Sequence, residues 1–321
     1  MSVTVAIPVR NGGPLFAGVL DALARQSVEH ELLVCDSGSR DDSVALARAH
    51  GARVIEIAPD LFSHGGTRNL LLREARGGHV ALLTQDAEPA DERWLERLLG
   101  GFDLAEDVGI VYGPYRPRPD ASPAVRVELE SWFASLAPDG RPQVERLTET
   151  ERALPVTHLI GRRGFFTDAN ACLSRAAWER VPFREVAYAE DRVLAIDMLR
   201  AGRAKAYVPE AAVLHSHEYS SSEQLRRCFD EWRGLREVYG FKEPASPQRV
   251  ARKLRGEVGA GRGRQTTVAL TRHHIVRLVG ALLGSRAGAL PPWVRGRLSL
   301  EGRTGFQPLR LDSDQLSNER T

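Results

Sequence analysis

The sequence is poor in cysteine and has no long apolar run. Its three cysteines, Cys35, Cys172 and Cys228, are far apart and form no CxxC pair. Disulfide frameworks and zinc sites need closer or more numerous cysteines, so buried thiols in a reducing compartment are the simpler interpretation. No apolar stretch approaches the roughly 18 residues that span a bilayer. The first residues lack a basic start, so we expect no signal peptide and a cytoplasmic protein.

Two phosphate-binding signatures are also missing. The chain contains neither GxGxxG nor GxxxxGK[ST], which weakens the case for a dinucleotide-binding or P-loop protein. Hydrophobic residues make up 42% and charged residues 27% of the 321 residues, as in ordinary soluble globular proteins. The length predicts one enzyme-sized core with an appendage.

The charge is unevenly distributed along the chain. The net charge is +2, but residues 245–321 contain 14 basic and 5 acidic side chains, a local net charge of +9. The remainder is therefore acidic. A basic tail on an acidic body either meets an anionic partner or simply forms a basic surface, and the pattern leaves both open.

The first 113 residues alternate between the spacing of strands and that of helices. Strand-like apolar runs cover residues 3–9, 32–35, 54–57, 80–84 and 108–112. Helical spacing fills the segments between them, and further helices are predicted at 127–136, 221–239 and 266–283. Such alternation predicts an α/β fold with a mostly parallel sheet, in which ligands bind beyond the carboxyl ends of the strands.

Polar residues follow three of these strands. Asp36 ends the second strand and Asp86 follows the fourth, and we expect both to project from neighbouring strands toward one edge. A single carboxylate there is more often a turn or capping residue, but two together favour a ligand site. One could accept the imide N–H of uracil or thymine, and the other could hold Mg²⁺ or Mn²⁺.

Four segments in this order resemble the inverting family-2 glycosyltransferases, which have the GT-A fold. They are VAIPVRNGG, LLVCDSGSRDDS, TQDA and YAED, and the resemblance covers roughly residues 1–220. It implies that the donor nucleotide sugar is bound by Pro8, Arg10, Asn11, Asp36, Ser37, Gln85 and Asp86. Asp86 would be the last carboxylate of the family's DxD-type metal motif. Because Thr84 and Gln85 replace the preceding carboxylates, the metal needs another ligand.

A further segment narrows the subfamily. Residues 62–69 read FSHGGTRN and resemble the FxHGxxRN signature of bacterial rhamnosyltransferases. Gly65 would let the backbone approach the donor, Arg68 would offer a fork to its diphosphate, and Asn69 would also contact it. The alternative is a Gly-Gly turn followed by an exposed arginine.

The second half of the resemblance supplies the predicted chemistry. Glu190 and Asp191 match the family's catalytic pair, in which Asp191 is the base that takes the acceptor's proton. Acidic residues in a helix's first turn are also common for dipole reasons alone. Asp168 and Asn170 could contact the donor sugar or be turn residues.

Two histidines follow a short apolar segment near the end of the resemblance. His215 or His217 would supply the missing metal ligand, with His215 preferred because it lies closer to the strand end. Both could instead be ordinary surface histidines. Zinc is not expected, since no further cysteine or histidine clusters nearby.

We therefore expect three functional regions. Residues 1–113 bind the donor, residues 114–220 bind the acceptor and carry the base, and residues 221–321 form a basic helical extension. The predicted activity is transfer of L-rhamnose from dTDP-L-rhamnose to a polysaccharide or lipid-linked glycan, with Mg²⁺ or Mn²⁺. A UDP-hexose transferase, a sugar nucleotidyltransferase and a non-catalytic nucleotide binder are the alternatives. The helix at 266–283 either packs on the body or lies on a membrane, and no nucleic acid partner is expected.

Overall fold

The computed structural model describes residues 2–243 and 264–306 and divides the chain into two compact units. The first comprises Met1–Glu185 and Glu190–His217, and the second comprises Val186–Ala189 and Glu218–Thr321. The second unit begins close to the start of the predicted extension at residue 221. The functional division of the first unit into donor and acceptor halves stays a prediction.

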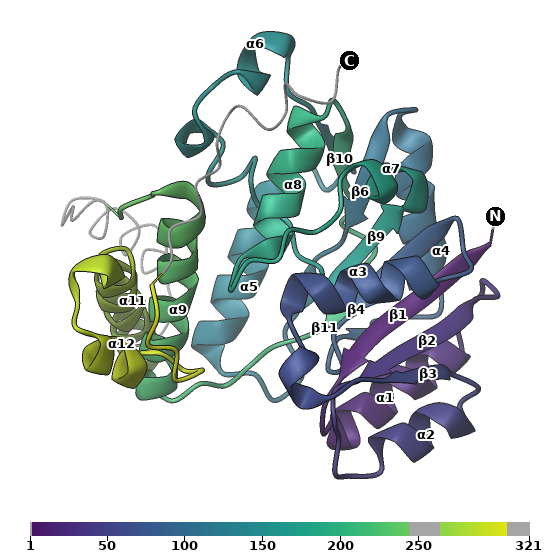
Figure 1. The fold of residues 1–321 in the computed structure, drawn as a ribbon, viewed down its shortest axis with the longest axis horizontal. Helices are drawn as coiled ribbons and strands as arrows, with labels where there is room; N and C mark the ends of the chain where they lie inside the picture. Colours follow the sequence, from purple (N-terminus) through teal and green to yellow (C-terminus); the bar gives the residue numbers. More distant parts are fainter. Residues whose placement is uncertain (1, 244–263, 307–321) are drawn as a thin grey trace. The chain divides into compact units, whose positions relative to one another are not determined.

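The first unit is built on an eight-stranded sheet in the order β3-β2-β1-β4-β9-β6-β10-β8 (Figure 1). The strands are β1 (Val3–Val9), β2 (Glu31–Asp36), β3 (Arg53–Glu56), β4 (His79–Leu83), β6 (Val108–Tyr112), β8 (Gln143–Glu145), β9 (Asn170–Ser174) and β10 (Ala204–Tyr207). The five strands predicted in the first 113 residues are all present. The unpredicted β9 runs antiparallel between β4 and β6.

Helices cover both faces of this sheet and produce a three-layer α/β/α arrangement. One face packs on α1 (Gly13–Ala24), α2 (Ser43–Ala49) and α4 (Trp94–Gly100). The other packs on α3 (His64–Glu74), α5 (Pro123–Leu136), α7 (Arg175–Arg180) and α8 (Glu190–Arg200). Side chains of β1 alternate between the two layers, because successive strand residues point to opposite faces. The mixed α/β fold predicted from the sequence is confirmed.

Shorter elements complete the first unit. The helix α6 (Glu149–Arg152) and 3-10 turns at Pro59–Leu61, Gly101–Leu104 and Val156–His158 lie in the connections. A small sheet joins β5 (Glu88–Pro89), β11 (Val213–Leu214) and β7 (Tyr115–Arg116), with β11 in the middle. Leu214 is paired with Glu88, so the chain that follows Asp86 lies beside the chain that precedes His215.

The binding edge differs from the prediction in one respect. Both β2 and β4 pair in parallel with β1, which lies between them, so Asp36 and Asp86 are not on neighbouring strands. Hydrogen bonds tie the intervening loops together. The backbone N–H of Arg10 donates to Gln85 Oε1 at 2.8 Å, and that of Asn11 donates to Ser39 Oγ at 2.8 Å.

The second unit is helical. It contains α9 (Ser221–Tyr239), α11 (Arg264–Gly284), a 3-10 turn at Ala287–Ala289 and α12 (Pro292–Leu298). A capping box at Ser220 starts α9, and Gly240 in the left-handed region (φ +66°) ends it. A Cβ at Gly280 would lie 2.7 Å from the Leu225 carbonyl, so glycine permits close packing of α11 on α9. No helix in residues 2–243 and 264–306 is both long and apolar enough to cross a bilayer.

Candidate active site

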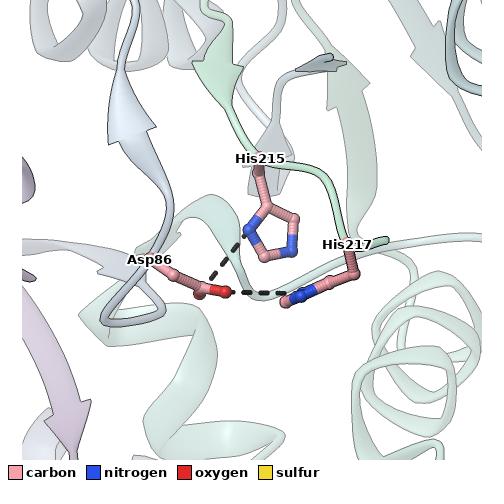
Figure 2. A group of neighbouring side chains, drawn as sticks. All are labelled: Asp86, His215 and His217. Atoms are coloured by element: carbon pink, nitrogen blue, oxygen red, sulfur yellow. Dashed lines mark ion pairs between the residues drawn. The ribbon is translucent and has the colours of Figure 1, made fainter. Parts of the chain in front are cut away.

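Three predicted metal ligands come together at the small sheet. Asp86 follows β4, and His215 and His217 follow β11, with the three side chains converging as Figure 2 shows. Asp86 Oδ1 lies 3.5 Å from His215 Nδ1, and Asp86 Oδ2 lies 3.4 Å from His217 Nε2. One potential ligand atom from each residue lies within 4.8 Å of the others. The structure brings both histidines to Asp86, although the sequence favoured His215.

The chemistry of this cluster fits a divalent cation. His215 is largely buried, and no group in the described part of the chain hydrogen-bonds its Nδ1. Burial lowers the pKa of His215 to about 4, so its imidazole is neutral near pH 7. The Tyr115 ring packs edge-on against the imidazole, with centroids 4.7 Å apart, and limits its rotation. A fixed neutral imidazole with an unused lone pair beside a carboxylate is a suitable donor set.

Asp36 presents a buried acceptor at the end of β2. Its Oδ2 accepts the backbone N–H groups of Gly38 at 2.9 Å and Ser39 at 3.0 Å. Its Oδ1 is buried and has no hydrogen-bond partner within the described residues. Gly38 has φ +87°, and a Cβ there would lie 2.7 Å from Pro59, so this turn requires glycine. One carboxylate oxygen is thus fixed, and the other is left for a ligand's N–H.

The other predicted donor-binding residues of this edge connect the loops. Gln85 accepts the Arg10 backbone N–H, the Asn11 side chain accepts a backbone N–H of the loop after β2, and the Ser37 hydroxyl donates to β1. Pro8 is half-buried in β1, and the Arg10 side chain is exposed. These bonds shape the edge around Asp36, whereas direct contact of these residues with a donor stays a prediction.

Arg68 lies among carboxylates. Its Nη2 donates to Asp168 Oδ1 at 2.8 Å, and its Nη1 lies 3.3 Å from Glu190 Oε1. His64 Nδ1 lies 3.8 Å from the same Glu190 oxygen. Only 5% of the Arg68 side chain is exposed. The guanidinium already neutralises two buried carboxylates, and its contact with a diphosphate stays a prediction.

Two further residues of the FSHGGTRN segment serve packing. A Cβ at Gly65 would overlap the carbonyl oxygen of Arg184. The Asn69 amide donates to the Phe183 carbonyl at 2.8 Å and accepts from the Phe183 N–H at 3.0 Å and from Trp178 Nε1 at 2.9 Å. These contacts attach α3 to the chain that leads toward Glu190. Direct contact of Gly65 and Asn69 with the donor stays a prediction.

The Asn170 side chain also makes its hydrogen bonds within the protein. Its Oδ1 accepts from Trp94 Nε1 at 2.8 Å, and its Nδ2 donates to the carbonyls of Pro114 at 3.0 Å and Ala211 at 2.8 Å. The side chain is fully buried. It joins the first residue of β9 to the segments before β7 and β11, and its predicted contact with the donor sugar stays a prediction.

Asp191 lies in the first turn of α8, in an environment that favours proton uptake. Burial raises the pKa of Asp191 well above its usual range, and the charges of Asp168 and Glu190 raise it further. Arg192 opposes this effect, and its backbone N–H donates to Asp191 Oδ1 at 2.7 Å. Burial likewise raises the pKa of Asp168 to about 6, against the opposing charge of Arg68. Carboxyl groups with raised proton affinity are suited to general base catalysis.

Tyr115 connects the acidic cluster to the histidine cluster. Burial raises the pKa of its phenol, and the charges of Asp168, Asp191 and Asp86 raise it further. Its hydroxyl also shares a hydrogen bond with Thr167. One side chain thus lies within electrostatic reach of Asp191 and Asp86 and packs on His215.

The sequence interpretation missed Tyr115 and also Arg118. The Arg118 guanidinium donates to the Asp86 carbonyl at 2.6 Å and lies 3.6 Å from Glu88 Oε2. Its backbone N–H donates to Ser216 Oγ at 3.1 Å. Arg118 therefore places a cation beside the metal-ligand candidates. It lies in a proline-rich connection without a recognisable motif, so only its position between Pro117 and Pro119 could have drawn attention to it.

Comparison with known proteins supports the same class of enzyme. The model of glycosyl transferase family 2 matches residues 4–166. The O-antigen chain rhamnosyltransferase RfbN of Salmonella typhimurium is 33% identical over 72% of this chain and 71% of its own. The corresponding WbaN of Salmonella anatum is 31% identical over 71% and 70%.

Solved structures share the fold at lower identity. The mannosyltransferase PcManGT of Pyrobaculum calidifontis, in complex with GDP-Man and Mn2+, superposes with a TM-score of 0.54 at 19% identity, over 89% of this chain and 73% of its own. Residues 1–349 of S. aureus TarS give 0.50 at 15% identity, over 89% and 90%. This chain therefore belongs to glycosyl transferase family 2 and is a glycosyltransferase with the GT-A fold.

Proposed function

We propose that the protein transfers L-rhamnose from dTDP-L-rhamnose to a hydroxyl of a polysaccharide or lipid-linked glycan, with inversion at the anomeric carbon. The observation that carries this proposal is the cluster of Asp86 with His215 and His217, whose neighbour Tyr115 packs on His215. The charge of Asp191 also raises the pKa of the Tyr115 phenol. A base and a diphosphate-binding end must lie within one sugar's length of each other for such a reaction. The similarity to two O-antigen chain rhamnosyltransferases supports rhamnose over a hexose carried by UDP.

Asp86, His215 and His217 would hold a divalent cation. Mg²⁺ prefers a shell of oxygen ligands, whereas a carboxylate with two imidazoles suits a softer ion, so we favour Mn²⁺. The bound metal would supply positive charge to the departing diphosphate. Arg118 lies beside the cluster and would add a second cation there, in the role that the sequence suggested for Arg68.

The acidic cluster performs the proton transfer. The acceptor oxygen forms a bond to the anomeric carbon, the bond from that carbon to the diphosphate oxygen breaks, and the hydroxyl proton passes to the Asp191 carboxylate. Arg68 and Glu190 fix the start of α8, because their ion pair joins α3 to α8. Burial and the charge of Asp168 raise the pKa of Asp191, which makes its carboxylate a stronger base.

The proposed nucleobase site at Asp36 predicts which nucleoside diphosphates the protein binds. Asp36 Oδ1 can accept the imide N–H that thymine and uracil share. We expect dTDP and UDP, with Mn²⁺, to raise the melting temperature of the protein, and GDP to have little effect because its purine is larger. In Asp36→Asn the amide can still accept the loop N–H groups, but its NH₂ then faces the imide donor. This variant should lose the dTDP response, and a larger response to GDP than to dTDP would contradict the assignment.

A separate experiment tests which sugar the donor carries, independently of its nucleobase. Release of dTDP from dTDP-L-rhamnose in the absence of acceptor should exceed release of UDP from UDP-glucose at equal concentrations. The reverse order would favour the UDP-hexose alternative while leaving the enzyme class unchanged.

The second unit supports a proposed peripheral contact with membranes that carry a lipid-linked acceptor. Val268, Ile275 and Val279 are exposed along one face of α11, and Trp293 is exposed on α12. Residues 245–321 carry a net charge of +9, which attracts anionic lipids. Pelleting with anionic liposomes at low salt but not at high salt supports this contact, and no pelleting at low salt overturns it.

A further inference from the structure

An exposed tryptophan lies on α5. Trp132 is 39% exposed. Its ring packs edge-on against the Phe165 ring, with the two ring centroids 5.0 Å apart. Phe165 is itself half-buried, so the two rings form one aromatic surface. Exposing an indole forgoes the free energy of burying a large apolar ring, which a ligand can recover on binding.

This aromatic surface continues to the proposed base. The Arg192 guanidinium lies over the Phe165 ring, with Cζ 5.9 Å from its centroid. Arg192 follows Asp191 directly, and the backbone N–H of Arg192 is hydrogen-bonded to the Asp191 carboxylate. Trp132, Phe165 and Arg192 therefore form a run of two aromatic rings and one cation that ends next to Asp191. We call these three residues the aromatic platform.

The platform is backed by other rings. Phe165 packs edge-on against Phe133 and Tyr112, at 6.0 Å in both cases. Phe133 in turn lies 5.1 Å from the Tyr115 ring, which packs on His215. The surface is thus anchored in the aromatic cluster that also holds a metal-ligand candidate. Such backing keeps a recognition surface at a fixed position relative to the reacting groups.

We propose that the aromatic platform is the acceptor subsite, which binds the sugar ring that carries the attacking hydroxyl. A pyranose has an apolar C–H face and a rim of hydroxyls. The face matches Trp132 and Phe165, and the rim matches the fixed donors of the Arg192 guanidinium. This proposal rests on the proposed function, because it assigns an acceptor to the base at Asp191. A protein partner docking on Trp132 is the competing occupant.

The test separates acceptor binding from donor chemistry. Wild-type protein is assayed with dTDP-L-rhamnose, Mn²⁺ and a panel of p-nitrophenyl hexopyranosides, and the best acceptor is retained. Trp132→Ala should raise the KM for that acceptor about tenfold, the effect expected for losing one aromatic contact. Acceptor-independent release of dTDP and the melting temperature should stay at the wild-type values. Trp132→Phe should restore most of the acceptor affinity.

A matched control is available in the second unit. Trp293 is 66% exposed on α12, and its proposed contact is with a membrane, which this assay lacks. With the p-nitrophenyl acceptors, Trp293→Ala should therefore leave acceptor KM and dTDP release unchanged. If Trp132→Ala transfers with wild-type acceptor KM, the platform binds something else, such as a protein partner, and the proposal is overturned. Equal loss of dTDP release and transfer would also overturn it, by showing a structural role. Failure of the wild type to turn over any nucleotide sugar would count instead against the proposed function.

Discussion

The variant Asp191→Asn is expected to transfer sugar about 10² to 10⁴ times more slowly than the wild type. The amide keeps the shape of the side chain but cannot take the proton from the acceptor hydroxyl. Donor affinity should change little, because the residues proposed to bind the nucleotide and the metal are Asp36, Asp86, His215 and His217. Initial rates of transfer and calorimetric donor titrations measure the two effects independently.

Glu190→Gln is the matched control for this variant. Glu190 Oε1 lies 3.3 Å from Arg68 Nη1, so Glu190 acts by holding the start of α8 and not by accepting the proton. Its replacement should reduce transfer by less than the Asp191 change. Transfer by Asp191→Asn at the wild-type rate would show that another group is the base.

The pH dependence of transfer follows from the same cluster. Burial and the charges of Asp168 and Glu190 raise the pKa of Asp191, and the base works only when it is deprotonated. Activity should therefore rise with pH along an acidic limb that lies above the ordinary range of an aspartate. Asp168→Asn removes one neighbouring negative charge, which lowers the pKa of Asp191 and should move this limb to lower pH. If the acidic limb of this variant lies at the wild-type pH, the limb does not report the titration of Asp191.

Asp86→Ala should abolish turnover and remove the metal dependence of donor binding. Asp86 is the one carboxylate in the cluster with His215 and His217, so its loss leaves two imidazoles and no negative charge to attract the cation. His215→Ala should weaken metal-dependent binding more than His217→Ala, because the His215 side chain is only 11% exposed and packs on Tyr115, whereas that of His217 is 42% exposed. Titration of Mn²⁺ into protein with dTDP measures these differences.

An exposed carboxylate provides the control for Asp86. Asp103→Ala, in the 3-10 turn Gly101–Leu104, should bind metal and donor like the wild type. All metal-dependent signals should vanish when the wild type is treated with a chelator and return when Mn²⁺ is added. Normal activity of Asp86→Ala in chelator-treated buffer would remove the metal from the mechanism.

The main strands and helices of the fold could be predicted from the sequence because each has a local hydrophobic periodicity. Strands β1, β2 and β4 are continuous apolar runs ending in polar loops, and helix α9 begins and ends at a capping box and a glycine. Strand β9 was missed because its sequence, NACLS, carries little strand propensity. It forms through pairing with β4 and β6, distant in the chain, and such pairing leaves no local pattern.

The sequence was sufficient to identify charged residues of the candidate site, but not to predict which groups those residues contact in the fold. Asp36, Asp86 and Asp191 stand in recognisable segments, and the structure gives each a buried or clustered setting suited to its proposed role. Arg68 looked like a diphosphate ligand because its partner Asp168 lies 100 residues further along the chain. The hydrogen bonds of Asn69 to the Phe183 backbone could not be predicted, because every residue type offers the same backbone groups. Packing across the fold decides such roles.

The central claim is a single displacement between the base at Asp191 and a diphosphate held near Asp86. The most direct test is the anomeric configuration of the first product formed from dTDP-L-rhamnose in the presence of Mn²⁺. It is measured by nuclear magnetic resonance after a chelator has removed the paramagnetic ion. Direct attack on the anomeric carbon predicts a product of inverted configuration. A product that retains the configuration of the donor would contradict the account, because a single displacement from the face opposite the diphosphate cannot give it.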